Sequence, residues 1–297
     1  MTSPSSPAQG DHWVRVMPVV FVLIWSTGFV VARLAMPHAP PMSFLGWRYA
    51  LSVGLFLGWV SLSGAAWPQG RGQVLHLAIS GVLMHAGYLG GVWAAVKLGL
   101  GAGTAALIVG LQPVLTAAWL SRPGAAHPVE GRQWLGLVMG LAGLLLVVQQ
   151  RLGAGQATVA NLLLAVLALV SITAGTLYQK RWVAPCDVRS AAVVQLLAAF
   201  VVTAPLSLLE TEPVNWHPDL LIAMAWSVLA LTLGGSSLLY LLIQRGAATQ
   251  VSSLMYLVPP CTAVLAWVMF DEPVSASVVA GMALTAAGVG LVLRSGR

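Results

Sequence analysis

Residues 101–120 read GAGTAALIVGLQPVLTAAWL and contain no charged side chain. A helix of about 20 apolar residues crosses the hydrocarbon core of a bilayer, which is about 30 Å thick. A second stretch, AATQVSSLMYLVPPCTAVLA at 247–266, aligns with the first when Pro113 is set on Pro259, an offset of 146. The two stretches predict a pair of related membrane-spanning helices.

The composition of the whole chain indicates a membrane protein. Hydrophobic residues fill 58% of the 297 positions and charged residues only 7%, whereas a soluble domain carries about 25% charged residues. The pI near 9.9 can indicate nucleic-acid binding. Here the basic residues stand singly between apolar runs, so we expect a lipid environment and no nucleic-acid partner. The cysteines Cys186 and Cys261 give no disulfide framework.

Ten apolar runs are long enough to cross a bilayer as helices. They lie at 16–34, 41–63, 73–96, 101–121, 132–150, 158–180, 188–209, 219–243, 247–269 and 274–293. Short connections rich in Gly, Pro and charge separate them, and residues 1–15, which are polar and rich in Pro and Ser, predict a disordered cytoplasmic tail. We therefore expect an all-α integral membrane protein with ten transmembrane helices.

The distribution of Lys and Arg predicts the orientation, because cytoplasmic loops carry the excess of basic residues. With the N-terminus inside, ten basic residues are cytoplasmic and three are external, and Arg48 lies within a span. The cytoplasmic ones are Arg15, Arg71, Arg122, Arg132, Lys180, Arg181, Arg189, Arg245, Arg294 and Arg297, and the external ones are Arg33, Lys97 and Arg151. Both termini are therefore expected in the cytoplasm of a bacterium, with the chain in its inner membrane.

The two halves of the chain match at four places with nearly one offset. Besides the proline pair, Gly28 and Arg33 match Gly175 and Lys180 at 147, the KLG at 97–99 matches the QRG at 244–246 at 147, and Gly136 and Gly143 match Gly281 and Gly288 at 145. Each half holds five spans, an odd number, so the second copy enters the membrane from the opposite side. This predicts two inverted five-helix repeats, 16–150 and 151–297, a recurring transporter design.

Several segments resemble one known family. IWSTGFVVAR at 24–33, GWRYAL at 46–51, LQPVLTAAWL at 111–120 and the long segment LYLLIQRGAATQVSSLMYLVPPCTAVLAWVMFDEP at 239–273 resemble the EamA family of the drug/metabolite transporter superfamily. The resemblance covers nearly the whole chain. It implies two inverted five-helix repeats that move metabolites or amino acids, usually outward. It also implies a cavity lined by helices three, four, eight and nine, gated by one, two, six and seven, with five and ten peripheral.

Polar residues inside a span are costly and therefore mark candidate functional positions. Arg48 lies about seven residues into the second span, and at the offset of 147 its counterpart is Gln195 in the seventh. Arg48 can attract a substrate carboxylate, or it can snorkel or cap carbonyls of a neighbouring helix. His85 lies near the middle of the third span, close to Tyr88, and is either a proton-sensitive substrate ligand or a neutral histidine bonded to a carbonyl.

Prolines interrupt two spans at matching places. Gln112 precedes Pro113, and Pro259 and Pro260 follow Tyr256. Proline removes a helical hydrogen bond and frees a carbonyl, which is tolerated in a membrane where protein or a wet cavity receives it. The prolines predict helix kinks, either beside a central site or as purely structural bends, and make Gln112 and Tyr256 candidate cavity residues.

Aromatic and hydroxyl side chains complete the set of candidates. Trp25 and Thr27 lie near the middle of the first span, and Tyr240 lies in the eighth. Aromatic rings can stack on a planar or apolar solute, although rings near a span end, such as that of Tyr240, equally suit the membrane interface. The glycine faces of the fifth and tenth spans predict close helix packing, with a homodimer through these peripheral helices as the alternative.

The absence of several sequence motifs reduces the number of possible functions. All eight carboxylates lie in tails, loops or span ends, and no metal-ligand cluster, Walker motif or phosphate loop is visible, so we expect no metal, cofactor or direct use of ATP. The sequence predicts a secondary transporter or exporter of small organic solutes that works by alternating access. The alternatives are a passive channel, which usually needs rings of polar groups, and a membrane-embedded enzyme, which needs a catalytic constellation.

Overall fold

A computed structural model describes residues 10–120, 131–153, 157–235, 238 and 257–294. These residues are predominantly helical, and they include no strand. The helices are α1 (Gly10–Ala35), α2 (Pro41–Ser63), α3 (Arg71–Gly81), η1 (Val82–Gly87), α4 (Tyr88–Lys97), α5 (Ala102–Val109), α6 (Gln112–Leu120), α7 (Gly131–Gly153), α8 (Val159–Trp182), α9 (Val188–Ser207), α10 (Pro218–Trp226), η2 (Ser227–Gly235), α13 (Val258–Phe270) and α14 (Ala276–Arg294). The expected all-α class is confirmed for these residues.

Five helical stretches in the described residues are long and apolar enough to cross a membrane. They are Pro41–Ser63, Arg71–Lys97, Val159–Trp182, Val188–Ser207 and Pro218–Gly235. Shorter apolar helices occupy Val19–Ala35, Ala102–Thr116, Trp134–Gln149, Val258–Phe270 and Ala276–Leu291. A helix satisfies its own backbone groups, which is why such runs fold this way in lipid. The total of ten transmembrane helices stays a prediction.

The helix boundaries follow local capping chemistry. At the start of α8 the Thr158 hydroxyl accepts the Asn161 N–H at 3.2 Å, and the Asn161 side chain accepts the Thr158 N–H at 2.9 Å. This reciprocal pair satisfies two backbone donors that lie outside the helical ladder. At the end of α2, Gly64 takes a left-handed conformation with φ 62°, which glycine adopts at little cost.

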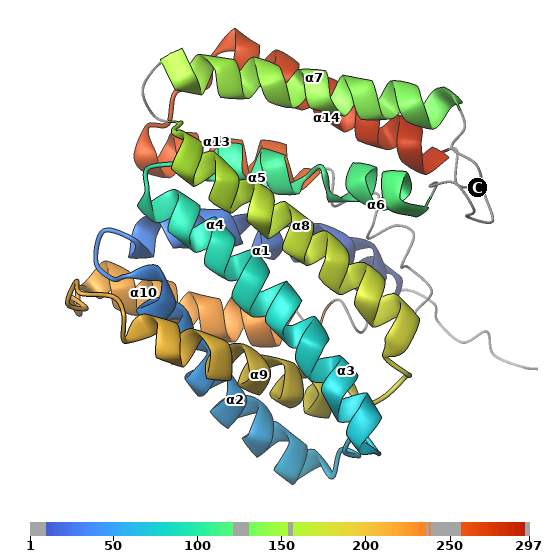
Figure 1. Cartoon of the computed structure of the whole chain (residues 1–297), viewed down its shortest axis with the longest axis vertical. Helices are drawn as coiled ribbons and strands as arrows, with labels where there is room; N and C mark the ends of the chain where they lie inside the picture. Colours follow the sequence, from blue (N-terminus) through green and yellow to red (C-terminus); the bar gives the residue numbers. More distant parts are fainter. Residues whose placement is uncertain (1–9, 121–130, 154–156, 236–237, 239–256, 295–297) are drawn as a thin grey trace, which may run out of the picture.

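The helices pack in pairs that cross between the two halves of the chain. α7 packs against α14, α2 against α9, and α5 against α13. α1 packs against α10 and η2, and α8 packs against α3, η1 and α4. Figure 1 shows α7 and α14 together along one edge of the molecule, with α2 and α9 toward the opposite edge. Much of the buried core therefore lies between the two halves.

Glycine brings α7 and α14 into direct backbone contact. A methyl group added at Gly143 would lie 2.4 Å from the Gly281 carbonyl oxygen, and one added at Gly288 would lie 2.5 Å from that of Gly136. Small residues allow helices to approach this closely in membranes. The glycine faces predicted from the sequence thus meet within one chain, and their alternative role in a homodimer stays a prediction.

Two segments have π-helical rather than α-helical hydrogen bonding, which the sequence analysis did not predict. The first, η1, interrupts the third expected span, and the second, η2, follows α10 in the eighth. Adding the offset of 147 to Val82–Gly87 gives 229–234, which lies inside Ser227–Gly235. Single π turns within helices are frequently found at functional sites. The two segments therefore direct attention to the residues around them.

Candidate functional site

A buried arginine joins α2 to η2. The Arg48 side chain, on α2, belongs to a residue only 7% exposed. Its Nη2 donates a hydrogen bond to the Thr232 hydroxyl at 3.2 Å, and that hydroxyl donates to the Ser227 carbonyl at 2.8 Å. The Thr232 bond spans five residues, which matches the π-helical register of η2. The guanidinium is therefore held to the second half of the chain by a hydroxyl that η2 itself fixes.

Several buried polar atoms near this bond have no hydrogen-bond partner among the described residues. They are Arg48 Nε, Ser52 Oγ and Ser227 Oγ. Ser52 follows Arg48 by one helical turn, so both side chains lie on the same face of α2. A buried polar group without a partner costs about 1–3 kcal/mol, and more if it is charged. Unsatisfied donors gathered at one helix contact are a candidate site for a ligand or water.

The η1 segment contributes His85 and places it beside α2. The Tyr49 hydroxyl donates to the His85 carbonyl at 2.9 Å, and the two rings meet edge to face with centroids 6.1 Å apart. Tyr88 follows His85 by three residues, at the start of α4, and is buried. The segments that carry the candidates Arg48 and His85 are thus in direct contact through Tyr49, and no described carboxylate pairs with Arg48.

Gln195 occupies the corresponding place in the other half. Its Nε2 donates to the Ser80 hydroxyl at 2.9 Å and to Gln179 Oε1 at 3.1 Å. At the offset of 147, Gln195 corresponds to Arg48 and Ser80 corresponds to Ser227. The contact of α2 with η2 thus has a counterpart in the contact of α9 with α3 and η1, although the hydrogen-bond partners differ. Gln195 has its partners, whereas Arg48 Nε does not.

Other candidates from the sequence lie at further helix contacts. Gln112 donates to the Thr176 hydroxyl on α8 at 3.0 Å. The Thr27 hydroxyl donates to the Ile24 carbonyl at 2.5 Å and accepts the Trp226 indole N–H at 2.8 Å.

Trp25 stacks obliquely on Phe21, with ring centroids 5.3 Å apart, and its ring borders Gly235 of η2. Tyr240 and Tyr256 lie outside the described residues.

The prolines lie at the beginnings of helices. Pro113 lies in the first turn of α6, after α5 has ended at Val109, and Pro259 and Pro260 lie in the first turn of α13. A proline in the first turn costs no helical hydrogen bond, because that N–H has no partner in the helix. The fourth expected span, 101–121, is interrupted by a turn at 110–111 just before its proline, and the kink at Pro113 stays a prediction.

A cluster of metal-ligating residue types, which the sequence analysis missed, lies where the α1–α2 connection meets the start of α10. Asp219 Oδ2 is 3.7 Å from His38 Nε2 and 3.3 Å from His217 Nδ1. The two imidazoles are stacked, with centroids 4.3 Å apart and planes 6° from parallel. Parallel stacked rings cannot both direct an in-plane nitrogen at one ion, so this arrangement is not set for a metal.

At one end of the α2–α9 pair, a carboxylate caps α2. Glu210, just after α9, accepts the backbone N–H groups of Met42 and Ser43, each at 2.8 Å, and the Ser43 hydroxyl at 2.8 Å. An anion at a helix N-terminus satisfies free N–H groups and complements the helix dipole. The start of α2 is therefore tied to the end of α9.

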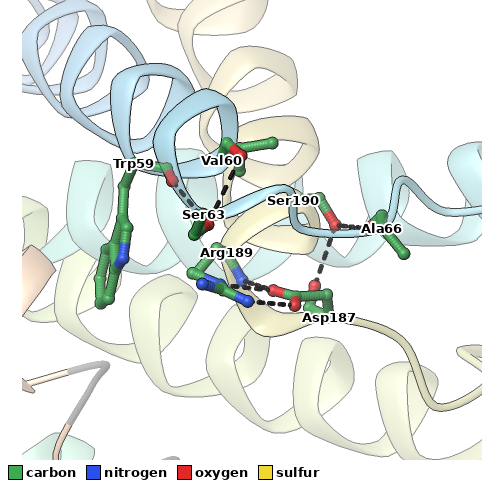
Figure 2. Close-up of polar contacts among 7 residues, drawn as sticks. All are labelled: Trp59, Val60, Ser63, Ala66, Asp187, Arg189 and Ser190. Carbon is green, nitrogen blue, oxygen red and sulfur yellow. Dashed lines mark hydrogen bonds and ion pairs between the residues drawn. The ribbon is translucent and has the colours of Figure 1, made fainter.

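At the other end, the start of α9 is tied to the end of α2 (Figure 2). The Ser190 hydroxyl, which corresponds to that of Ser43 at the offset of 147, donates to the Ala66 carbonyl at 2.7 Å. Asp187 caps α9 by accepting the Arg189 N–H at 2.9 Å, and its carboxylate receives the Arg189 guanidinium at 3.0 and 2.7 Å. These side-chain hydrogen bonds from Arg189 lower the pKa of the Asp187 carboxyl.

Removing this cap is expected to destabilise the protein in a pH-dependent way. The Asp187→Ala variant should lose about 1 kcal/mol at neutral pH, as is usual for an N-cap. Because the folded-state pKa lies below the unfolded value of about 3.9, the stabilisation is present above that value and disappears as the pH falls through the folded pKa. Thermal unfolding in detergent at pH 7 and at decreasing pH measures this difference.

Ser63 provides the matched control for that variant. Its hydroxyl donates only to Trp59 and Val60 carbonyls of its own helix, at 2.6 and 3.4 Å (Figure 2). Ser63→Ala should therefore change the unfolding temperature little at any pH. If the loss of stability in Asp187→Ala stayed constant down to acid pH, it would contradict the assignment of Asp187 as an ionised cap.

Comparisons with known proteins agree with this architecture. The model of the EamA-like transporter family matches twice, over residues 13–149 and 159–294. An uncharacterized transporter of Bacillus subtilis, YvbV, is 25% identical over 291 residues, which cover 91% of this chain and 88% of the relative. The uncharacterized inner membrane transporter YedA of Escherichia coli K12 is 28% identical over 209 residues, covering 70% and 66%.

Other relatives carry a more specific name, and a solved structure shares the fold. A probable amino-acid metabolite efflux pump of Salmonella typhimurium is 23% identical over 166 residues, covering 56% of this chain and 52% of the relative. A solved structure described as "Crystal structure of protein" matches with a TM-score of 0.64 and 20% identity, covering 96% of this chain and 99% of the other. This chain, a multi-pass membrane protein, belongs to the EamA-like transporter family.

Proposed function

We propose that the chain is a secondary transporter that exports small organic metabolites across the bacterial inner membrane by alternating access. It has ten transmembrane helices in two inverted repeats, 16–150 and 151–297, with both termini in the cytoplasm. Its substrate site lies where α2 meets η1 and η2, around Arg48, His85 and Tyr88, with Trp25, Thr27, Gln112, Gln195, Tyr240 and Tyr256 as further lining residues. The names of two relatives suggest amino acids or related metabolites as cargo.

The observation that carries this proposal is that the packing repeats when the two halves are exchanged. α2 contacts η2 as α9 contacts α3 and η1, and α1 contacts α10 and η2 as α8 contacts α3, α4 and η1. An inverted pair of equal units can exchange conformations and thereby open one site to either face. The repeated contacts support such an exchange. The Arg48 contact in one half and the Gln195 contact in the other are the two corresponding (mirrored) contacts that would exchange.

The hydrogen bonds that join α2 and α9 at their two ends can act as gates in the alternating-access cycle; we call each set of bonds a tie. Glu210 fastens the start of α2, and Ser190 fastens the start of α9 to Ala66. By the charge distribution, the first tie is external and the second cytoplasmic. We assign Glu210 to the outer gate and Ser190 to the inner gate. Opening one end would break one tie while the other remains.

The channel and enzyme alternatives have less support. The polar groups at Arg48 come from different helices of one chain and form no ring of repeated groups, which a selective pore usually needs. An enzyme needs a nucleophile with an adjacent base, and the described hydroxyls near Arg48, those of Ser52, Ser227 and Thr232, show no hydrogen bond to His85.

Cysteine labelling tests the mechanism. Ser52→Cys, in a background with Cys186→Ser and Cys261→Ser, places a thiol beside Arg48 at a position that is fully buried here. Alternating access predicts that a membrane-impermeant maleimide reaches this thiol from outside in right-side-out vesicles and from inside in inverted vesicles. Ala165→Cys, fully buried on α8, is the control and should resist labelling from both sides.

Transport itself is measured by counterflow in proteoliposomes. Saturable counterflow of a solute, together with two-sided labelling of Ser52→Cys, supports a transporter. Labelling from one side only would contradict alternating access, and non-saturable flux would favour a channel. Conversion of the solute into a product would favour an enzyme.

A further inference from the structure

We propose that the site at Arg48 binds the carboxylate of an organic acid that carries a net negative charge, in preference to a zwitterionic amino acid. This inference rests on the proposed function and narrows its substrate class. It follows from a comparison of the two mirrored contacts, from the chemistry of the unsatisfied atoms, and from the balance of charge within the membrane.

The two mirrored contacts differ in whether their buried polar atoms have hydrogen-bond partners. On the Gln195 side, a neutral amide donates to Ser80 and Gln179, and neither Gln195 nor Ser80 has an unsatisfied buried atom. On the Arg48 side, a charged guanidinium replaces the amide, and Ser227 replaces Ser80. There, Arg48 Nε and Ser227 Oγ have no partner among the described residues. The repeat therefore contains one completed polar contact and one incomplete one.

The incomplete contact has the chemistry of an anion site. A guanidinium can only donate hydrogen bonds, and the Ser52 and Ser227 hydroxyls can donate as well as accept. The Thr232 hydroxyl, whose own hydrogen goes to the Ser227 carbonyl, already accepts one guanidinium N–H. A carboxylate supplies two acceptor oxygens with about four lone-pair positions, and guanidinium–carboxylate bonds are among the strongest in proteins. It would complete the contact that the protein leaves open.

The net charge of the buried site distinguishes between an organic acid and an amino acid as the ligand. Arg48 is buried, and none of the described residues forms an ion pair with it. All eight carboxylates of the chain lie at the ends of spans or outside them. A bound monoanion would neutralise Arg48, whereas the ammonium of a zwitterion would bring a second buried positive charge that no protein carboxylate can balance. An isolated buried charge is strongly unfavourable.

The surroundings favour an organic anion over an inorganic one. Tyr49, which follows Arg48 on α2, and Tyr88 at the start of α4 are both buried, and the His85 ring meets the Tyr49 ring edge to face. Aromatic side chains offer large apolar surface to the body of a solute. A small inorganic ion would use the donors and leave this surface without a partner.

Binding to the purified protein in detergent at pH 7.5 tests the inference with matched probes. The probes are 3-phenylpropionate, its neutral amide and phenylalanine, together with 4-methylpentanoate, its amide and leucine. Each set keeps one carbon skeleton and changes the polar groups that determine the net charge. We expect each carboxylate to bind at least about tenfold more tightly than its amide and its amino acid, which is the usual effect of losing one charged hydrogen bond. Chloride and phosphate, added as competitors, identify a site for inorganic anions.

Variants assign any preference to the proposed atoms. Arg48→Gln copies the residue of the mirrored contact and should remove the preference for the carboxylate. Ser52→Ala and Ser227→Ala, which each remove one hydroxyl, should weaken carboxylate binding about three- to tenfold and leave amide binding unchanged. Thr203→Ala is the control, because the buried Thr203 hydroxyl donates only to carbonyls of its own helix, at 3.0 and 3.3 Å.

Each outcome decides the inference. Equal binding within a set, tightest binding of the amino acid, or a preference that is undiminished in both Ser52→Ala and Ser227→Ala would overturn it. Displacement of the carboxylates by chloride or phosphate at similar concentrations would assign the site to inorganic anions instead. If amino acids or amides bind best while Ser52→Cys is still labelled from both sides, the substrate class is wrong and the transport mechanism stands.

Discussion

We expect the Gly143→Ala variant to lose about 3 kcal/mol or more of its free energy of unfolding, at the upper end of the range for an overpacked contact. The added methyl group would lie 2.4 Å from both the Gly281 carbonyl oxygen and the Thr285 hydroxyl, and 2.8 Å from the Thr285 backbone nitrogen. Two of these atoms are backbone, so no flexible side chain can move aside. The whole of α14 would have to separate from α7.

Gly290 offers a matched control for that experiment. It lies in α14 itself, and a methyl group added there would meet no atom within 4 Å. Gly290→Ala should be neutral or stabilising by up to about 1 kcal/mol, since alanine favours a helix more than glycine does. Thermal unfolding in detergent and the yield of folded protein compare the two variants. Equal stability of both would contradict the backbone contact between α7 and α14.

The second large effect is expected for Glu210→Gln. The carboxylate accepts three hydrogen bonds from Met42 and Ser43, and an amide has only one oxygen to replace two. Its NH₂ group would face backbone donors. We expect a loss of about 2–3 kcal/mol, the range for hydrogen bonds to a charged group. If Glu210 closes the outer gate, the Ser52→Cys thiol should also react faster from the outside in this variant.

Glu212→Gln is the control for the charge of the same loop. Glu212 forms an ion pair with Lys97 at 2.5 Å, but its side chain is 60% exposed. Exposed pairs of this kind contribute about 0–1 kcal/mol. Its replacement should therefore alter neither the stability nor the labelling rate by much. A similar response of both variants would show that the loop charge, rather than the cap on α2, is responsible.

Much of the helical layout could be predicted from sequence, because long apolar runs bounded by charge or proline have one stable form in lipid. The expected span 41–63 coincides with α2, and 158–180 nearly coincides with α8 (Val159–Trp182). Arg48 could also be singled out, since a basic residue within an apolar run is rare and costly. The expected span 188–209 also nearly coincides with α9 (Val188–Ser207), whereas 101–121 is interrupted by a turn at 110–111, and the helix of 73–96 changes register at η1 (Val82–Gly87).

The sequence could not reveal those register changes. Whether a turn is α- or π-helical depends on neighbouring helices, such as the Gln195 backbone that presses on Gly81 just before η1. Ser52 and Ser227 were missed for a related reason. A serine or threonine inside a helix commonly bonds a carbonyl of its own helix, as Ser26 does with Val22 at 2.7 Å. Only coordinates distinguish such a hydroxyl from one left without a partner.

The backbone contact between α7 and α14 also restricts how the molecule can move. Backbone carbonyl groups of each helix lie so close to glycines of the other helix that an added methyl group would clash with them. Neither helix can therefore rotate or slide along the other without a steric clash. Because α7 and α14 come from opposite halves of the chain, we expect the two helices to form one rigid unit to which both halves are connected. Under the proposed alternating access, spin labels placed on α7 and α14 should keep one separation, while labels on α2 and α10 should show two separations.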